Sequence, residues 1–341
     1  FDVYMLRLID LLERYPEFHY LLEQAFHYRK LKERRPDLFV KIKKFVQEGR
    51  LEFVTGLIST IENNVTNGES FVRNMQLGLQ WLKENFDVQV NQCVMVDTFG
   101  FPPQMPQVLR LFGYQNMFGS RFGSNIAEDA FIVQGLDGTE LLVAGKDQQA
   151  PYIKKEYVVF HYYTDRKGLD QVFDYAEKER DFPMLIMPYS ENEVVPLSYM
   201  MERMDKGTCQ FRFGTMEEFF RLMESEREKL KRRSADLNPE FSGTFSLRHT
   251  LRVKNRSAEY LLLELEKLAA WSNSGEAASR AEELWWEIAY VQFHDLITGS
   301  HPTDVYEDCL RRYDRIIENC KKEIQKLLIT KDTEKQGIFK I

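Results

Sequence analysis

The hydrophobic periodicity of this sequence changes near residue 230, and this change most constrains the fold. Up to about residue 225, amphipathic helical segments alternate with short apolar runs such as Leu51 to Val54, Cys93 to Val96 and Met184 to Met187. Such alternation predicts crossover units on a largely parallel sheet. Beyond Lys229 the apolar residues recur at helical spacing as far as about Leu328. The sequence therefore predicts an α/β domain followed by a helical domain.

We place the boundary between these two domains at residue 235, so that the predicted domains cover residues 1–235 and 236–341. The second domain has three helical segments joined by short polar connections, which favours an antiparallel three-helix bundle. These segments are Arg252 to Trp271, Ala277 to Leu296 and Thr303 to Leu328. In the first domain the longest predicted helix runs from Gly68 to Phe86, and a capping box at Thr215 to Glu218 opens a later one.

Composition limits the classes of partner. The 341 residues, 43% of them hydrophobic, can bury a core large enough for two domains. The 46 Lys and Arg are interleaved with 53 acids, so no basic face is available for nucleic acid. No apolar run is long enough to cross a membrane. Four cysteines without CxxC spacing favour reduced thiols and a cytoplasmic location.

One candidate site residue is a carboxylate at a strand end. The apolar run Cys93 to Val96 leads directly into Asp97-Thr98-Phe99-Gly100. Catalytic groups gather at the carboxyl ends of parallel strands, which makes Asp97 a candidate for chemistry. An aspartate in this position can also cap the next helix or turn, and spacing alone favours that simpler interpretation.

A second candidate is a histidine–aspartate pair in the segment Phe293 to Gly299, near the end of a predicted helix. A histidine on an apolar helix is more often a hydrogen-bonded core residue than a ligand, and Asp295 can be a cap or loop residue. Taken together with Asp97, however, His294 and Asp295 have the composition of one polar site.

Both segments resemble the signature segments of glycoside hydrolase family 38, the zinc-dependent retaining α-mannosidases. The run from Val96 to Gly113 is similar to the family's DTFGH-x-x-Q-x-P-Q-I-L…G segment. The stretches Asn67 to Met75 and Gly243 to Glu259 are similar to its SGES-x-x-RQ and GT-x-TSR…K-x-x-NR-x-x-E segments. The resemblance spans nearly the whole chain and implies a (β/α)7-barrel-like catalytic domain with a C-terminal three-helix bundle.

The resemblance also implies roles for individual residues. Asp97 would be the nucleophile and a zinc ligand, and His294 would be a second zinc ligand. Asp295, Arg121 and Phe99 would contact the sugar. Arg121 is similar to a family arginine beside the nucleophile, and the alternative interpretation is an ordinary surface charge.

Zinc needs about four ligands of N, O or S type. The resemblance implies that the other two, a His and an Asp from an HxHxDxxW-type segment, lie upstream of Phe1, because Asp2 is too isolated to replace them. We therefore expect the 341-residue chain alone to hold little zinc and to be a poor catalyst.

The acid/base carboxyl is the least defined part of the predicted site. Where the family has this aspartate, the sequence reads Pro188-Tyr189-Ser190-Glu191-Asn192-Glu193, with Asn192 at the aligned position. An amide cannot donate the proton, so Glu191 is the favoured replacement and Glu193 the alternative. Both could also be solvated loop acids.

The resemblance thus implies a zinc-dependent retaining α-mannosidase that hydrolyses terminal α-mannosides of glycans. Its partners would be a carbohydrate substrate and, in an oligomer, a second copy of the chain. Two alternatives remain: another zinc-dependent hydrolase on a similar barrel, such as a deacetylase, and a catalytically inactive carbohydrate-binding relative, which Asn192 would suit.

Overall fold

The computed structural model describes residues 1–122, 126, 128–145, 158–162, 170, 173–174, 177, 185–189, 197–206, 211–234, 237 and 241–338. The chain forms two compact units. The first contains Phe1–Gly56 and Trp81–Glu240, and the second contains Leu57–Gln80 and Phe241–Ile341. Helix α4 (Gly68–Phe86) begins in the second unit and ends in the first. Its bounds are those predicted from the sequence.

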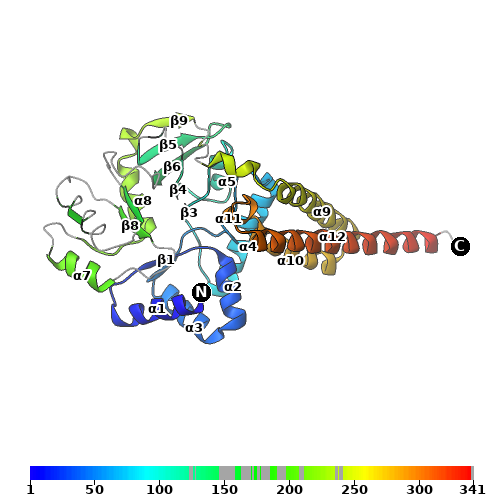
Figure 1. Ribbon diagram of the computed structural model, residues 1–341, viewed down its shortest axis with the longest axis horizontal. Helices are drawn as coiled ribbons and strands as arrows, with labels where there is room; N and C mark the ends of the chain where they lie inside the picture. The colour runs from blue at the N-terminus through cyan, green and yellow to red at the C-terminus, as the bar shows by residue number, and fades with distance from the viewer. Residues whose placement is uncertain are drawn as a thin grey trace. The chain divides into compact units, whose positions relative to one another are not determined.

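The first unit is built on short strands that run mainly parallel (Figure 1). Strands β1 and β2 form one parallel pair, and β7 and β8 form another. The largest sheet has the order β3-β4-β6-β5-β9. The bounds are β1 (Tyr20–Leu22), β2 (Leu51–Phe53), β3 (Cys93–Met95), β4 (Asn116–Gly119), β5 (Ala130–Gln134), β6 (Glu140–Gly145), β7 (Val158–Tyr162), β8 (Leu185–Tyr189) and β9 (Arg232–Ser234). The predicted α/β class is confirmed.

Strands β5 and β6 form an antiparallel hairpin that the sequence analysis did not predict. The connection contains Asp137-Gly138, a pair that favours a tight turn. Gly138 has a φ of 85°, and the Thr139 N–H donates to the Asp137 carboxylate at 3.1 Å. The hairpin makes the sheet mixed, because β4 and β6 are parallel whereas β5 runs against β6.

The core of this unit lies between the sheet and helix α8 (Met216–Ser225). The predicted capping box is present, with Thr215 accepting from the Glu218 N–H and Glu218 accepting from the Thr215 N–H. On the buried side of α8, apolar side chains pack against those of the strands. They include Val94, Phe118, Ile132, Leu142, Phe219, Phe220 and Met223. The cap and the apolar stripe together fix where α8 begins and which face is buried.

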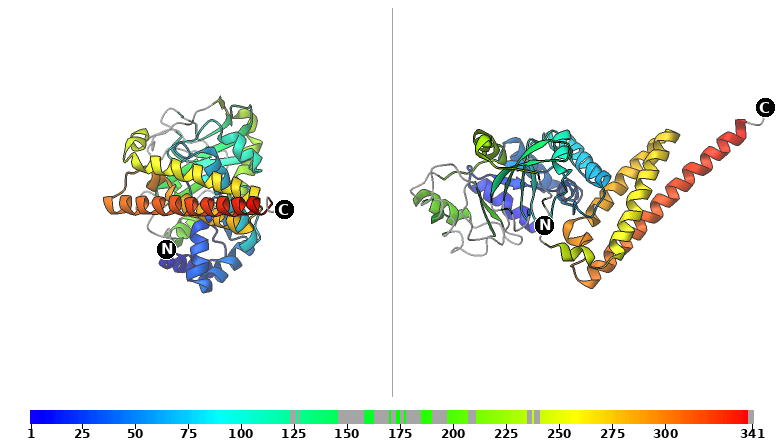
Figure 2. Two further views of the ribbon diagram at one scale, coloured as in Figure 1. Left: turned by 90° about the vertical axis from the view of Figure 1, so that its right-hand side faces the viewer. Right: turned by 90° about the horizontal axis from the view of Figure 1, so that it is seen from above.

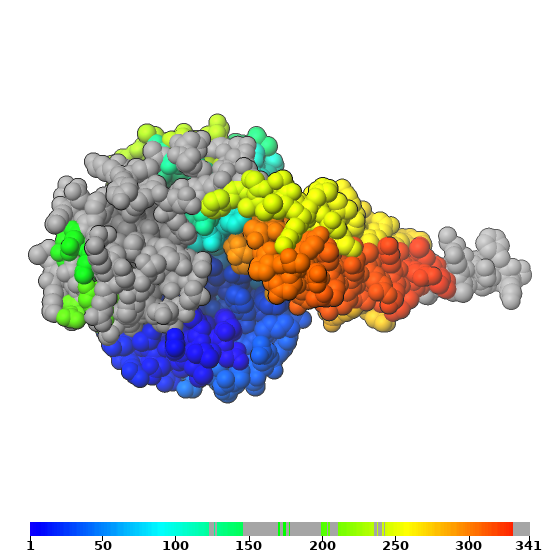
Figure 3. Space-filling model, viewed as in Figure 1, coloured from blue at the N-terminus to red at the C-terminus, as the bar shows by residue number. Residues whose placement is uncertain are grey.

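The other described helices of the first unit are α1 (Asp2–Arg14), α2 (Ala25–Arg34), α3 (Pro36–Gln47), α5 (Met105–Leu111) and α7 (Leu197–Lys206), with a 3₁₀ turn η1 (Arg227–Lys229). Helices α1 and α3 pack against each other, and their outer residues form one continuous blue surface in Figure 3. No helix in the described part of the chain is long and apolar enough to span a membrane.

The second unit contains the predicted three-helix bundle. Helices α9 (Thr250–Ser272), α10 (Gly275–Val291) and α12 (Thr303–Ile338) contact one another pairwise (Figure 2). A 3₁₀ turn η2 (Ser242–Ser246) precedes α9, and the short α11 (His294–Ile297) lies between α10 and α12. Cys309, Tyr313, Ile316 and Cys320 are buried residues of α12 and recur at helical spacing. Cys93, Cys309 and Cys320 are all buried free thiols, and Cys209 lies outside the described residues.

Candidate functional site

Asp97 lies just beyond the carboxyl end of β3. Its φ of 72° is in the left-handed region, which non-glycine residues seldom occupy. Its backbone N–H donates to Ser120 Oγ at 2.9 Å. Ser120 directly follows β4, whose Gly119 is paired with Met95 of β3. Two neighbouring parallel strands thus end together and hold the backbone of Asp97 in this conformation.

Arg121 also lies at this strand edge, and its guanidinium forms an ion pair with the Asp97 carboxylate. The two side chains are only 11% and 16% exposed. The guanidinium carbon is 5.6 Å from the ring centroid of Phe99. Arg121 has a φ of 61°, so both members of the pair have strained backbones. The structure thus brings together three of the predicted site residues, and the pair orients the carboxylate.

Two glycines allow the strands at this edge to approach closely. Gly145 ends β6 with a φ of 126°, and a Cβ built there would lie 1.8 Å from the Gly119 carbonyl oxygen. A Cβ at Gly119 would in turn lie 2.8 Å from the ring of Phe122. Any larger residue at Gly145 would separate β4 from β6 and displace the chain that carries Ser120 and Arg121.

Glu23 is a further carboxyl at the strand ends, and the sequence analysis missed it. It directly follows β1, as Asp97 follows Val96 beyond β3. Desolvation, with a smaller contribution from the Asp97 carboxylate, raises the pKa of Glu23 to about 7. Glu23 also helps to raise the pKa of the buried Cys93 thiol on β3. A carboxylate directly after a short apolar run was the signal that could have identified it.

In the second unit, His294 begins α11 and is 5% exposed. Its Nδ1 is 2.9 Å from the Thr60 carbonyl oxygen, and its backbone N–H donates to the same oxygen at 3.2 Å. A carbonyl can only accept, so Nδ1 carries a proton, and in the neutral ring Nε2 is then the nitrogen with the lone pair. This tautomer is the one that a metal-binding histidine with a carbonyl partner adopts.

A buried polar network fixes the chain directly before His294. Gln292 Nε2 donates to Asn255 Oδ1 at 2.9 Å and to Glu259 Oε1 at 3.1 Å. Glu259 is fully buried and also accepts from Ser70 Oγ at 2.9 Å. The Gln292 carbonyl accepts from the Glu62 N–H at 3.1 Å. These bonds hold α9, α10 and the segment before α4 in one arrangement.

Asp295 is the second residue of α11 and is exposed. Two arginines hold the chain that follows it. Arg252 Nη1 donates to the Ile297 carbonyl at 3.2 Å, and Arg248 Nη1 donates to the His301 carbonyl at 2.6 Å. Asp295 is thus an exposed helix residue, and side-chain bonds to the backbone fix the chain that follows it.

The remaining predicted site residues have not been placed. Glu191, its neighbour Asn192 and the alternative Glu193 all lie outside the described residues. Over the ranges that the structure describes, no group of three or more His, Cys, Asp and Glu side chains comes together in a way that could hold a metal ion.

Comparison with known proteins decides the family. The model of the glycosyl hydrolases family 38 N-terminal domain matches residues 4–243. The chain belongs to glycosyl hydrolase family 38. The model of the α-mannosidase middle domain matches residues 240–329, the stretch that holds the three-helix bundle.

Curated relatives of this family 38 chain are α-mannosidases. Alpha-mannosidase G of Dictyostelium discoideum is 26% identical over 92% of the chain, and alpha-mannosidase 2C1 of Homo sapiens is 24% identical over 90%. The chain spans 29% and 30% of the lengths of these two proteins.

Solved structures agree on the fold. An α-mannosidase from Enterococcus faecalis V583 matches 94% of the chain and 38% of its own, with a TM-score of 0.77 and 17% identity. A second family 38 protein from Enterococcus faecalis matches 96% of the chain and 38% of its own, with a TM-score of 0.71 and 19% identity. At these identities the likeness supports a common fold, which for residues of the first unit is consistent with a barrel-like catalytic domain.

Proposed function

We propose that this family 38 chain forms the catalytic part of a zinc-dependent retaining α-mannosidase that acts on terminal α-mannosides of glycans. The observation that carries the proposal is Asp97, a half-buried carboxylate with a left-handed backbone at the carboxyl edge of the sheet, oriented by Arg121. Family membership and the names of the relatives supply the substrate class.

In this mechanism the Asp97 carboxylate attacks the anomeric carbon, and the glycosidic oxygen leaves with a proton from a second carboxyl group. That carboxyl then removes a proton from water, which releases the sugar with its configuration retained. Arg121 orients the carboxylate of Asp97, because Nε and Nη2 of its planar guanidinium both contact Oδ1. Glu191 is our candidate for the second carboxyl, and Glu193 is the alternative.

Two residues of the chain have donor atoms suited to a zinc site. His294 would ligate through Nε2 of the neutral ring, because Nδ1 is bonded to the Thr60 carbonyl. Asp97 supplies a carboxylate oxygen, and both donor types are ones that zinc accepts. When bound, zinc would act as a Lewis acid and template for the sugar hydroxyls.

The test of the nucleophile uses the enzyme that contains this chain. We expect Asp97→Ala to lower kcat/KM for an aryl α-mannoside by more than about 100-fold, because the covalent intermediate cannot form. Asp87→Ala is the matched control, since Asp87 is an exposed aspartate of the same unit paired with Lys83. With azide and an activated aryl mannoside, Asp97→Ala should yield the mannosyl azide of inverted configuration.

A variant with more than about one-tenth of the parent activity would show that Asp97 is not the nucleophile. An inactive parent that binds mannosides without turnover would instead support the second candidate function, a carbohydrate-binding relative. The observation that favours this candidate is Asn192, an amide at the position aligned with the family's acid.

A further inference from the structure

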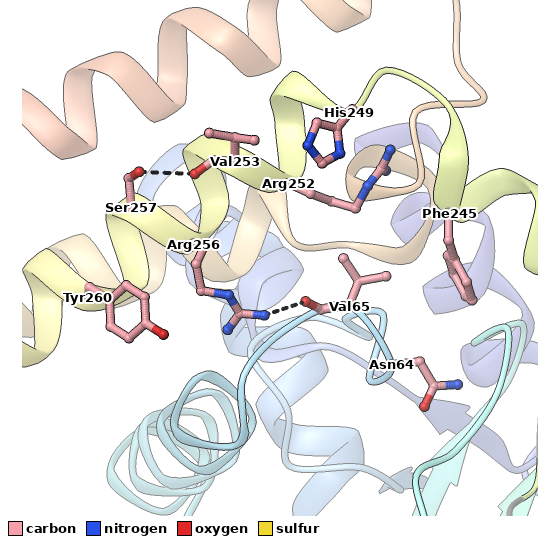
Figure 4. Close-up of a pocket in the computed structure, with 9 residues that line it drawn as sticks. All are labelled: Asn64, Val65, Phe245, His249, Arg252, Val253, Arg256, Ser257 and Tyr260. Carbon is pink, nitrogen blue, oxygen red and sulfur yellow. Dashed lines mark hydrogen bonds between the residues drawn. The ribbon is translucent and has the colours of Figure 1, made fainter.

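The second unit contains a surface cleft of about 600 Å³ that the proposed mechanism does not use (Figure 4). The first turns of α9, the turn η2 and the segment before α4 line it. Its lining residues are Asn64, Val65, Phe245, His249, Arg252, Val253, Arg256, Ser257 and Tyr260. Pockets for small organic ligands have about this volume.

One face of α9 gives the cleft its charge. His249, Arg252 and Arg256 lie three and four residues apart, a spacing that places them on the same side of the helix. None of the nine lining residues is acidic. The first turn of α9 also has no acidic residue, so the positive end of the helix dipole is not offset there.

The two arginines have different partners. Arg256 Nη1 is paired with Glu259 Oε2 at 2.7 Å, and its Nη2 donates to the Val65 carbonyl at 3.3 Å. Arg252 instead donates to backbone carbonyls, those of Leu247 and Ile297. Within the described ranges no salt bridge involves Arg252, and burial lowers its pKa. A half-buried guanidinium that has only neutral acceptors favours an incoming anion.

Of the three basic side chains in the cleft, the described contacts pair only Arg256 with an acid. Glu259 is fully buried and already accepts from Arg256, Ser70 and Gln292. Glu62 is also fully buried and accepts from the Asn64 N–H at 3.3 Å. Neither carboxylate is exposed to solvent in the cleft, so an anion entering it meets the arginine and histidine side chains first.

Apolar groups line the rest of the cleft. Val253 and Tyr260 are 51% and 64% exposed, which is high for large apolar side chains, and Phe245 is half-buried. Figure 4 shows Phe245 across the cleft from Arg252 and Arg256 of α9 and from His249, which directly precedes this helix. Aromatic side chains offer a flat apolar surface to a ring. A ligand that fits both parts has an anionic group and a ring of moderate size.

We propose that this cleft binds a sugar phosphate, with the phosphate group at Arg252 and His249 and the sugar ring against Phe245. Arginine and a helix N-terminus are the elements that recognise phosphate in other sites. A phosphate dianion is favoured over a carboxylate because it has more oxygens and more charge to accept from both the Arg252 guanidinium and the His249 imidazole. This proposal is independent of Asp97 and His294, so failure of the proposed mannosidase activity would not affect it.

Isothermal titration of the chain with glucose 6-phosphate, glucose, glucuronate and inorganic phosphate tests the proposal. We expect glucose 6-phosphate to bind, and glucose to bind at least about tenfold more weakly. We also expect 0.5 M salt to weaken the binding of glucose 6-phosphate. Binding of glucuronate as tight as that of glucose 6-phosphate would overturn the phosphate assignment. Equal binding of glucose and its phosphate, or no binding of either, would overturn the anion site.

Variants then locate the site. His249→Ala and Arg252→Gln should each raise the dissociation constant of glucose 6-phosphate about tenfold, because each removes a donor to a charged oxygen. Lys254→Gln is the control, since Lys254 lies on the same helix, is paired with Asp314 and does not line the cleft. Because Arg252 also bonds to the backbone, methyl NMR shifts of Val65 and Val253 on titration provide a second measurement in the unmodified chain. Unchanged methyl shifts at saturation would refute the location.

Discussion

Replacing Glu23 with glutamine tests the electrostatics of the strand edge. The side chain follows β1 beside the Asp97 carboxylate, and desolvation raises its pKa from 4.5 to about 7. The pKa of this carboxyl is higher in the folded chain than in the unfolded chain. Its contribution to the free energy of unfolding is therefore fully present below the unfolded pKa of 4.5. That stability is lost as the pH rises through the folded value of about 7. Above pH 7 the folded chain holds an ionised carboxylate that is desolvated and lies near the charge of Asp97.

The size of the effect follows from the shift. Each pKa unit corresponds to about 1.4 kcal/mol, so the shift of Glu23 costs the folded chain about 1 kcal/mol at pH 5 and about 3 kcal/mol at pH 8. Glutamine has nearly the same shape and does not titrate. Relative to the parent, Glu23→Gln should therefore gain about 2 kcal/mol of stability between pH 5 and pH 8.

The assay is urea unfolding at several pH values in the presence of a chelator, with hydrogen exchange of peptides from β1 and β2 reporting on the first unit. Glu48→Gln is the control, because Glu48 is an exposed glutamate of the same unit. Asp97→Asn should lower the pKa of Glu23, since it removes one cause of the raised value, and the loss of stability should then occur at lower pH. A stability difference between Glu23→Gln and parent that is the same at pH 5 and pH 8 would refute the reasoning.

Three further changes test other parts of the structure. Gly145→Ala should destabilise the first unit by more than about 3 kcal/mol in urea unfolding, because the Cβ would overlap the Gly119 carbonyl. Bonds from Lys231 and Arg233 lower the pKa of Glu128 to about 2. Glu128→Gln should therefore destabilise the chain above pH 4.5, and the difference in unfolding free energy from the parent should disappear as the pH falls from 4.5 to 2. His294→Ala should lower bound zinc in the full enzyme, measured by emission spectrometry, whereas Asp295→Ala should not.

Local sequence patterns determined the elements whose causes lie within a few residues. Helix α4 has its predicted bounds because its apolar periodicity is continuous from Gly68 to Phe86. Helix α8 begins where Thr215 and Glu218 form the predicted capping box. The position of Asp97 after β3 was also readable, because a carboxylate directly after an apolar run must leave the sheet at its edge.

Only the tertiary structure decided features that depend on residues far apart in the chain. The shift of Glu23 depends on its burial and on a carboxylate more than seventy positions later, and neither is visible in its neighbours. Glu259 is a charged residue on a helix by sequence, yet bonds to Ser70 and Gln292 make it the buried centre of a network. Residues 57–80 belong to the same compact unit as the bundle for the same reason. Partners separated by about 190 positions supply the hydrogen bonds that make their burial favourable.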